Sequence, residues 1–283
     1  MGRFSVETQI DMGQFEEEAS HLRAWDDDDP RALLWLPFEL GIWPRWSTIE
    51  ALKETLAEQA PFAFMISRVR FEGDARFQPE PTDPAERERS QVEHLAAQQI
   101  LLHCGLLPIK IALLRRHGRW TVDRVIAALS VGDSQVDRSL RGGLQAFEAA
   151  DHWTALHVLV PQLERFVRMI GVAVGANLHA YTPGGGLRWR ALEELLDEPR
   201  ARAVIGDDIA KDINAVFTGP HGPNIRNNLA HGALDYVDDG EPAAVATLMA
   251  LLALTLLLAA ARSQAEEADH DEESSDSAAE GHE

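Results

Sequence analysis

The amino-acid sequence predicts an all-α fold in which a C-terminal helical bundle follows an N-terminal helical region. Apolar residues recur at helical spacing along most of the chain, as at Ile49, Leu52 and Leu56. Apolar residues make up 45% of the chain, which is enough to build a sizeable core. Clusters of proline and glycine separate the helical segments at residues 79–84, 182–186 and 219–223.

Several segments carry the helical pattern, and local signals mark their ends. Thr121 and Asp151 each stand directly before such a segment, where a side-chain oxygen can cap free backbone N–H groups. Gly105 and Pro108 are expected to end the helix before them, and Pro161 to kink its helix or delay its start. Residues 62–71 fit a helix or a short extended piece. The expected helices are 48–59, 86–102, 122–129, 134–150, 151–174, 189–196, 209–216, 225–236 and 242–262.

The domain organisation follows from this pattern. Residues 1–133 form an N-terminal helical region without a recognised role, and residues 134–262 form the bundle. Residues 263–283 hold nine acidic side chains, no lysine or arginine and no hydrophobic period, which predicts a disordered acidic tail. One hypothesis for this tail is that it mimics RNA and occupies a nucleic-acid cleft.

The net charge of −20 bears on the possible partners. Phosphate contacts supply most of the nonspecific affinity for nucleic acid, so an acidic chain needs a local basic cleft to bind it. The single cysteine, Cys104, excludes a disulfide within the chain and is expected to be a small buried hydrophobe. One cysteine and the lack of a signal-peptide pattern favour a cytoplasmic protein.

Residues 243–261 form a nearly unbroken apolar stretch of 19 residues. A stretch of this length fits either a buried core helix or a membrane span. Thr247 and Thr255 interrupt it, its flanks are acidic, and only Arg262 lies nearby as a positive charge. We therefore expect the central helix of a soluble bundle, with a membrane-tethered form as the weaker alternative.

The most informative segment spans residues 222–232. Asn224 follows a helix-breaking loop and is expected to act as an N-cap. A helix from residue 225 buries one face, and its first backbone N–H groups offer an anion site. An ordinary capped helix with a polar face fits the same spacing. The polar side chains at its start and on its other face are Asn224, Arg226, Asn227, Asn228 and His231.

The spacing of Arg226 and His231 resembles the Arg-x(4–6)-His motif of HEPN domains, including the polar residue directly after the arginine. More narrowly, Arg226-Asn227-x3-His231-Gly232 resembles the signature of a bacterial and eukaryotic family of unknown function. Residues 157–168 look like that family's upstream helix, with its Pro-x-x-Glu-x-x-x-Arg pattern. The resemblance covers about residues 150–260 and leaves the N-terminal half unassigned.

The resemblance implies a bundle of four to five helices that dimerises, with the two Arg/His elements facing each other across a cleft. It implies an endoribonuclease without metal or other cofactor, acting in stress, toxin or phage-defence biology, where a partner protein or antitoxin is possible. His231 would act as general base or acid at the ribose 2′-OH, and Arg226 would stabilise the phosphorane. Asn227 would orient His231. The products would be a 2′,3′-cyclic phosphate and a 5′-OH.

Further residues are candidates for contact with RNA. Glu164 and Arg168 lie four residues apart and fit either an intrahelical ion pair or a cleft wall. His221 fits either a loop residue or a cleft residue. The full candidate set for RNA binding is Asn224, Asn228, Arg168, Glu164 and His221.

Two further sequence patterns bear on metal binding and on regulation by nucleotidylation. His152 and His157 lack the His-Glu-x-x-His spacing of zinc sites, so no metal site is expected. Toxin relatives regulated by nucleotidylation carry a tyrosine two residues after the histidine, whereas this chain has Ala233 there. Two functions stay open: the endoribonuclease, favoured by the intact motif, and an inactive scaffold that binds RNA, nucleotide or protein, favoured by the acidic charge.

Overall fold

The computed structural model describes residues 12–59, 70–72, 76–78, 81–232 and 240–280. Helices dominate this part of the chain, which confirms the all-α class. Its elements are α1 (Met12–Ser20), α2 (Arg23–Asp26), the 3-10 helix η1 (Pro30–Trp35), α3 (Leu36–Glu39), α4 (Trp46–Gln59), β1 (Arg70–Glu72), β2 (Arg76–Gln78), α6 (Pro84–Arg116), α7 (Val122–Leu129), α8 (Ser134–Glu148), α9 (His152–Ala173), β3 (His179–Tyr181), β4 (Leu187–Trp189), α10 (Leu192–Leu196), α11 (Pro199–Ile205), α12 (Asp207–Phe217), α13 (Ile225–Ala230) and α14 (Gly240–Glu280).

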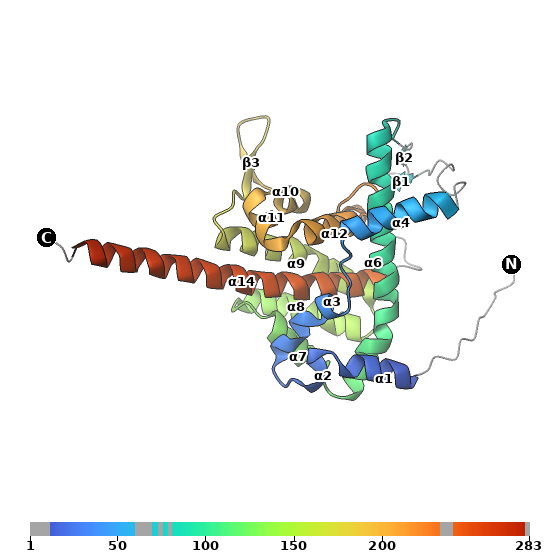
Figure 1. Ribbon diagram of the computed structural model, residues 1–283, viewed down its shortest axis with the longest axis horizontal. Coiled ribbons are helices and arrows are strands. Elements are labelled where there is room, and N and C mark those ends of the chain that lie inside the picture. Colours follow the sequence, from blue (N-terminus) through green and yellow to red (C-terminus); the bar gives the residue numbers. More distant parts are fainter. Residues whose placement is uncertain (1–11, 60–69, 73–75, 79–80, 233–239, 281–283) are drawn as a thin grey trace.

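Helices α8, α9 and α14 form the centre of the molecule (Figure 1). The first half of α14 is almost wholly buried, including Thr247, whose hydroxyl donates to the Ala243 carbonyl at 2.8 Å. This confirms that residues 243–261 form a core helix. Both α6 and α14 are long and apolar enough to cross a membrane, and 78% of the apolar window of α14 is buried inside the protein.

Helices α8 and α9 approach each other closely at Gly143. A Cβ atom built there would lie 2.6 Å from the Leu159 side chain, so only glycine fits without movement. The Asp151 side chain caps α9 by accepting a hydrogen bond from the Thr154 N–H, as predicted, and the helix starts at residue 152 and continues through Pro161. The Thr121 cap of α7 is also confirmed.

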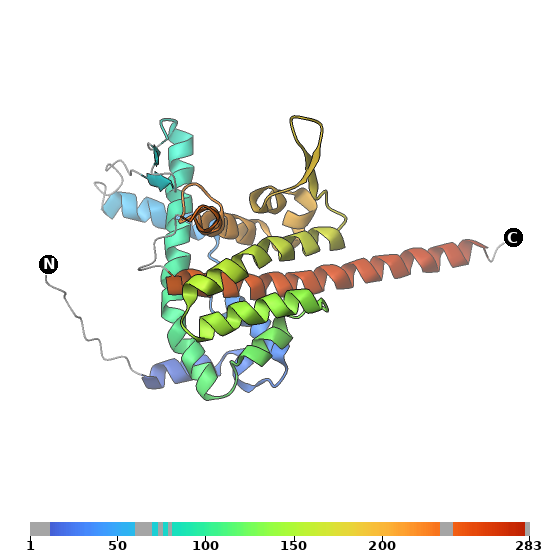
Figure 2. The same cartoon turned by 180° about the vertical axis from the view of Figure 1, so that it is seen from behind.

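Helix α6 corrects the prediction of a break after residue 102. It continues through Gly105 and Pro108 to Arg116 and crosses the beginning of α14 (Figure 2). Buried side chains on both sides of the proline, including Cys104 and Ile111, stabilise the helix against the loss of one backbone hydrogen bond. Cys104 is the expected small hydrophobe, and its burial raises the pKa of its thiol to about 12.

The N-terminal region shares its core with the bundle. Side chains of η1, α3 and α7 belong to the same hydrophobic cluster as those of α8, α9 and α14. Trp46 of α4 reaches α12, where its indole Nε1 donates to Asp212 Oδ1 at 2.9 Å. The core therefore continues across residue 133, and the division at that point stays a prediction.

The predicted helix 189–196 is wrong in its first half. A two-stranded antiparallel hairpin, β3–β4, occupies residues 179–189, and α10 begins only at Leu192. The predicted loop at 182–186 forms the turn of this hairpin, where Thr182 Oγ1 accepts a hydrogen bond from the Gly186 N–H. Of residues 62–71, only 70–71 lie within the described part of the chain, in β1.

Helix α14 also differs from the sequence prediction at its C-terminal end. It continues to Glu280 and projects beyond the helical body, whereas residues 263–283 were predicted to be a disordered tail (Figures 1 and 2). Alanine and glutamate favour helix, and the buried half of α14 supplies a preformed turn from which the helix propagates.

Candidate functional site

The loop before the Arg226 segment is held against α12 by two glycines. A Cβ atom at Gly222 would lie 1.6 Å from the Ala215 carbonyl oxygen, and one at Gly219 would lie 2.9 Å from that of Asn214. Any side chain at Gly222 would therefore push the loop away from α12. This contact fixes where α13 begins.

Helix α13 is shorter than predicted. It runs from Ile225 to Ala230 rather than to residue 236, because Gly232 adopts a left-handed backbone (φ +66°) that ends helices. Ile225 and Leu229 are buried, as expected for its inner face. With six residues, the helix offers only a small aligned dipole for the predicted anion site.

Asn224 precedes α13, but its side chain does not cap the helix as predicted. Its backbone is left-handed (φ 49°), a conformation that asparagine tolerates better than most residues. Its Oδ1 instead accepts a hydrogen bond from Asn227 Nδ2 at 2.8 Å. The two asparagine side chains thus form a brace at the start of α13.

Arg226 is held by two neighbours. Its Nη1 donates to Asn227 Oδ1 at 2.8 Å, and its Nη2 lies 3.3 Å from Glu164 Oε2 on α9. Glu164 also forms an ion pair with Arg168. The predicted site residues Arg226, Asn227, Glu164 and Arg168 therefore form one connected network, in which Asn227 positions the arginine.

Three members of this network, Arg226, Glu164 and Arg168, line a cavity of about 420 Å³ between α9 and α13. Glu164 and Arg168 thus satisfy both predicted roles, as an ion pair and as part of a cavity wall. The Nε atom of Arg168 is buried and lacks a hydrogen-bond partner among the described residues, whereas its Nη2 pairs with Glu164. The lining residues are His157, Val160, Pro161, Glu164, Arg168, Arg226, Leu229 and Ala230. Two guanidinium groups against one carboxylate make the cavity locally cationic.

His157 begins the segment 157–168 that resembles the family's upstream helix, but it was not among the predicted site residues, and it lines this cavity. Its Nδ1 lies 2.9 Å from the Trp153 carbonyl oxygen. A carbonyl only accepts, so Nδ1 carries the proton and Nε2 keeps its lone pair in the neutral ring. The spacing of His157, Pro161, Glu164 and Arg168 places all four on one helix face and was the available signal.

His231 lies apart from this cavity lining. It is the exposed residue that ends α13, and its backbone N–H donates to the Asn227 carbonyl at 3.0 Å. The hydrogen bonds of the Asn227 side chain go to Arg226 and Asn224. The arrangement therefore differs from the prediction that Asn227 orients His231.

The two remaining candidates hold the loop rather than line the cavity. Asn228 Nδ2 donates to the Pro223 carbonyl at 2.8 Å. His221 Nε2 lies 4.0 Å from Glu93 Oε2 on α6, with only 14% of its side chain exposed. Glu93 lines a different cavity, and His221 is not among the residues that line the cavity beside Arg226.

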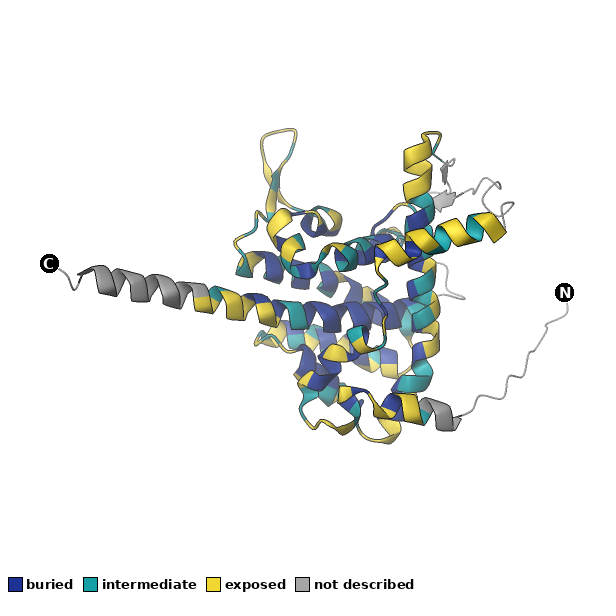
Figure 3. Ribbon diagram, in the orientation of Figure 1, coloured by how far each residue is buried: buried dark blue, intermediate teal, exposed yellow. Residues whose placement is uncertain are grey.

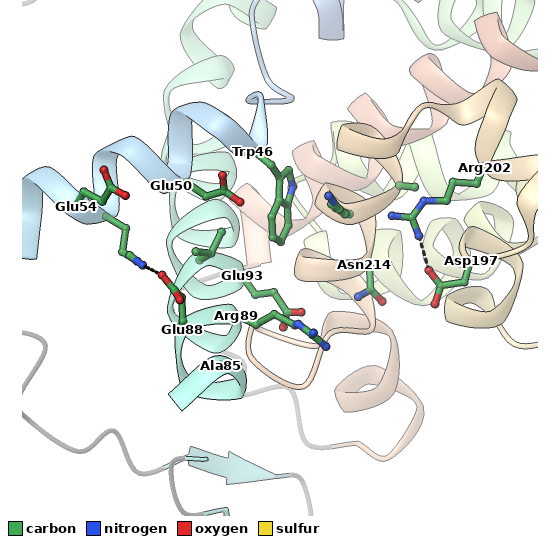
Figure 4. Close-up of a pocket in the computed structure, with 14 residues that line it drawn as sticks. Trp46, Glu50, Glu54, Ala85, Glu88, Arg89, Glu93, Asp197, Arg202 and Asn214 are labelled. Carbon is green, nitrogen blue, oxygen red and sulfur yellow. Dashed lines mark hydrogen bonds and ion pairs between the residues drawn. The ribbon is translucent and has the colours of Figure 1, made fainter. Parts of the chain in front are cut away.

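That second cavity, of about 600 Å³, lies between α4, α6 and α12 and was not predicted (Figure 4). Several of its charged groups are already paired within the protein. Lys53 pairs with Glu88, and Arg202 lies 2.7 Å from Asp197. Its other acidic lining residues are Glu50, Glu54 and Glu93. Carboxylates outnumber cations here, which makes this cavity a poorer phosphate site than the one beside Arg226.

Within the described residues, no group of three or more His, Cys, Asp or Glu is placed to hold a metal ion. No protein-family model, curated protein or solved structure matches the chain. A functional assignment therefore rests on the side chains of the cavity between α9 and α13 and on the motif that they include.

Proposed function

We propose that this chain is a metal-independent endoribonuclease that acts through Arg226 and His231. The observation that carries the proposal is the fixed position of Arg226, which Glu164 and Asn227 hold at the edge of a cavity that also contains Arg168. A preorganised guanidinium stabilises the charge that develops on a phosphodiester in the transition state. Arginine also presents a planar fork of donors that matches phosphate oxygens.

In the proposed reaction, His231 removes the proton from a ribose 2′-OH. The 2′ oxygen attacks the adjacent phosphorus, and the bond from phosphorus to the 5′ oxygen breaks. The leaving 5′ oxygen takes up a proton from a general acid. The products are a 2′,3′-cyclic phosphate and a 5′-OH, and Arg226 stabilises the phosphorane between them.

The general acid needs a second protonated group. In a dimer whose motifs face each other, His231 of the second copy supplies it, and this is the arrangement we propose. His157 is the alternative source within the same chain, because it lines the cavity and presents Nε2. RNA and a second copy are thus the proposed partners, while the cytoplasmic location and an antitoxin-like partner stay predictions.

The test is cleavage of RNA by the purified protein in EDTA, with the product ends mapped. We expect cyclic-phosphate ends, and a loss of rate of about 100-fold or more for His231→Ala and Arg226→Ala. His117→Ala removes an exposed histidine at the end of α6 and should cleave at the wild-type rate. Absence of cleavage, or equal cleavage by His231→Ala, would remove the proposal.

A catalytically inactive scaffold is the second candidate. Two observations favour it: Glu164 already neutralises part of the charge of Arg226, and the whole chain carries a charge of −20. Under this alternative the protein binds RNA, a nucleotide or a protein without changing it. Binding of RNA with no product after prolonged incubation would select this function.

A further inference from the structure

The β3–β4 hairpin carries its large side chains on one face. Antiparallel pairing sets His179 opposite Trp189 and Tyr181 opposite Leu187, and residues two apart on a strand point the same way. These four residues are all exposed, with Tyr181 at 81% and Trp189 at 56%. In Figure 3 the ribbon of the hairpin is coloured mostly as exposed. A face of this kind is unusual on a soluble protein and indicates a binding surface.

The hairpin face adjoins the cavity of the proposed active site. The Arg168 guanidinium carbon lies 5.6 Å from the centre of the Trp189 ring, a cation–π contact. Arg168 is also part of the cavity lining with Arg226. Arg168 therefore contacts the hairpin face through Trp189 and also lines the cavity, so the hairpin face and the cavity adjoin each other.

The charge around the hairpin identifies the class of ligand. Residues 177–191 include Arg188 and Arg190 and no acidic residue, in a chain with a net charge of −20. Arg188 is paired with Glu194, while the Arg190 side chain donates from Nε to the backbone carbonyl of His179 at 3.3 Å. Together with Arg168 and Arg226, these side chains favour a ligand that combines flat apolar groups with phosphates.

We propose that the hairpin face formed by His179, Tyr181, Leu187 and Trp189 stacks unpaired bases of single-stranded RNA whose backbone enters the Arg168–Arg226 cavity. This inference rests on the proposed function, for which it names the substrate class. In a duplex the bases are stacked on each other and their faces are closed to the protein. Stacking on aromatic side chains is sequence-tolerant because every base has a π-face.

The experiment measures binding separately from cleavage. A fluorescently labelled 12-nucleotide 2′-O-methyl RNA has no 2′-OH to react, so its anisotropy reports binding alone. We expect the single strand to bind more tightly than the same sequence in a duplex, and Trp189→Ala and Tyr181→Ala each to weaken its binding about tenfold. Trp189→Phe should restore most of the affinity, because it keeps a stacking face.

The chain offers a matched control at Trp35. This tryptophan is 37% exposed and has the Arg23 guanidinium 4.2 Å from its ring centre, so it reproduces the same cation–π pair elsewhere on the surface. Trp35→Ala should bind the oligonucleotide like the wild type. An abasic oligonucleotide of equal charge should bind the wild type weakly. It should bind Trp189→Ala with the same weak affinity, because it has no base to stack.

Each other result overturns the inference. It fails if Trp189→Ala binds like the wild type, if the wild type binds the duplex as tightly, or if the single strand does not bind. If Trp189→Ala changes the oligomeric state relative to the wild type on size exclusion but binds RNA like the wild type, the hairpin face would be assigned to contact with a second copy of the chain. If the protein binds single-stranded RNA through Trp189 but does not cleave unmodified RNA, the nuclease proposal fails and the stacking surface stands. If it cleaves RNA but Trp189→Ala binds like the wild type, the stacking surface fails and the nuclease proposal stands.

Discussion

At the residue scale, Asp212 is the buried group whose ionisation matters most. Its Oδ1 accepts a hydrogen bond from Trp46 Nε1 at 2.9 Å, and its Oδ2 is buried without a hydrogen-bond partner. Burial raises the pKa of this carboxyl to about 8, the Trp46 hydrogen bond opposes the shift, and the nearby charge of Asp208 adds to it. The carboxyl is therefore largely neutral at pH 7, at the contact that joins α4 to α12.

The raised pKa of Asp212 predicts a pH-dependent stability. Its ordinary pKa is 3.8, so between about pH 4 and pH 8 the folded protein holds a proton that the unfolded chain has lost. The free energy of unfolding should therefore fall as pH rises through this window. Asp212→Asn keeps the acceptor for Trp46 but cannot ionise, so it should flatten this dependence and stabilise the fold at pH 8 by about 1 kcal/mol or more.

Urea unfolding at pH 5 and pH 8 measures this effect. Asp123→Asn is the control. The Asp123 side chain is 85% exposed, so loss of its charge should change the free energy of unfolding little at either pH. If the difference between pH 5 and pH 8 is the same for Asp212→Asn as for the wild type, Asp212 is ionised in the folded protein and the prediction is wrong.

At the element scale, two adjacent glycines of α8 have opposite roles. Gly143 faces Leu159 of α9 with no room for a Cβ atom, while Gly142 is exposed and has nothing within 4 Å of its Cβ position. We expect Gly143→Ala to destabilise the protein by about 1–3 kcal/mol through overpacking. Gly142→Ala should stabilise it by about 0.5–1 kcal/mol, because alanine favours helix. Thermal unfolding measures the stability change of both variants. If Gly143→Ala and Gly142→Ala change the stability equally, α8 and α9 can move apart easily at Gly143 and the prediction is wrong.

The sequence predicted the elements whose signals are local. The caps at Thr121 and Asp151 and the helices that follow them depend on neighbouring residues alone. The continuation of α6 through Pro108 depends on its burial against other helices, which no local signal encodes. The hairpin escaped prediction for a similar reason: its strands have three residues each, too few for an alternating pattern to stand out.

The candidate site was predicted in part. The resemblance brought Arg226, Asn227, Glu164 and Arg168 into one set, and these residues contact each other in the structure. The relation of His231 to them was not predictable from an ideal helix, because Gly232 ends α13 at that point. The spacing of motif residues along a helix therefore predicts which side chains share a face only for residues that lie within the helix.

At the scale of the whole molecule, charge is distributed unevenly. The acidic C-terminal segment begins beside the end of α9, where Glu266 and Met169 line one groove. Because α14 continues as a helix, each further residue adds about 1.5 Å of distance from the body. Residues 267–280 therefore extend away from the cationic cavity of their own chain, which disfavours the hypothesis that the tail mimics RNA there.

The dimer is the whole-molecule property that the proposed mechanism requires. One chain exposes a single His231, so a reaction that needs both a base and an acid at the motif uses both copies. If wild-type protein is diluted with excess His231→Ala protein and the subunits exchange, only wild-type pairs should cleave. At one wild-type chain in four, the rate per total protein should be about one sixteenth of the undiluted rate, as random pairing in a two-fold dimer gives.

The same mixture distinguishes the alternative in which His157 supplies the acid. Each wild-type chain then carries both imidazoles, so the rate should fall only to about one quarter, in proportion to the wild-type fraction. His157→Ala should in that case lose cleavage as fully as His231→Ala, whereas in the two-copy mechanism it should retain most of the rate. Analytical ultracentrifugation of the mixture confirms that the chains pair, because a proportional fall has no bearing on the mechanism unless mixed dimers form.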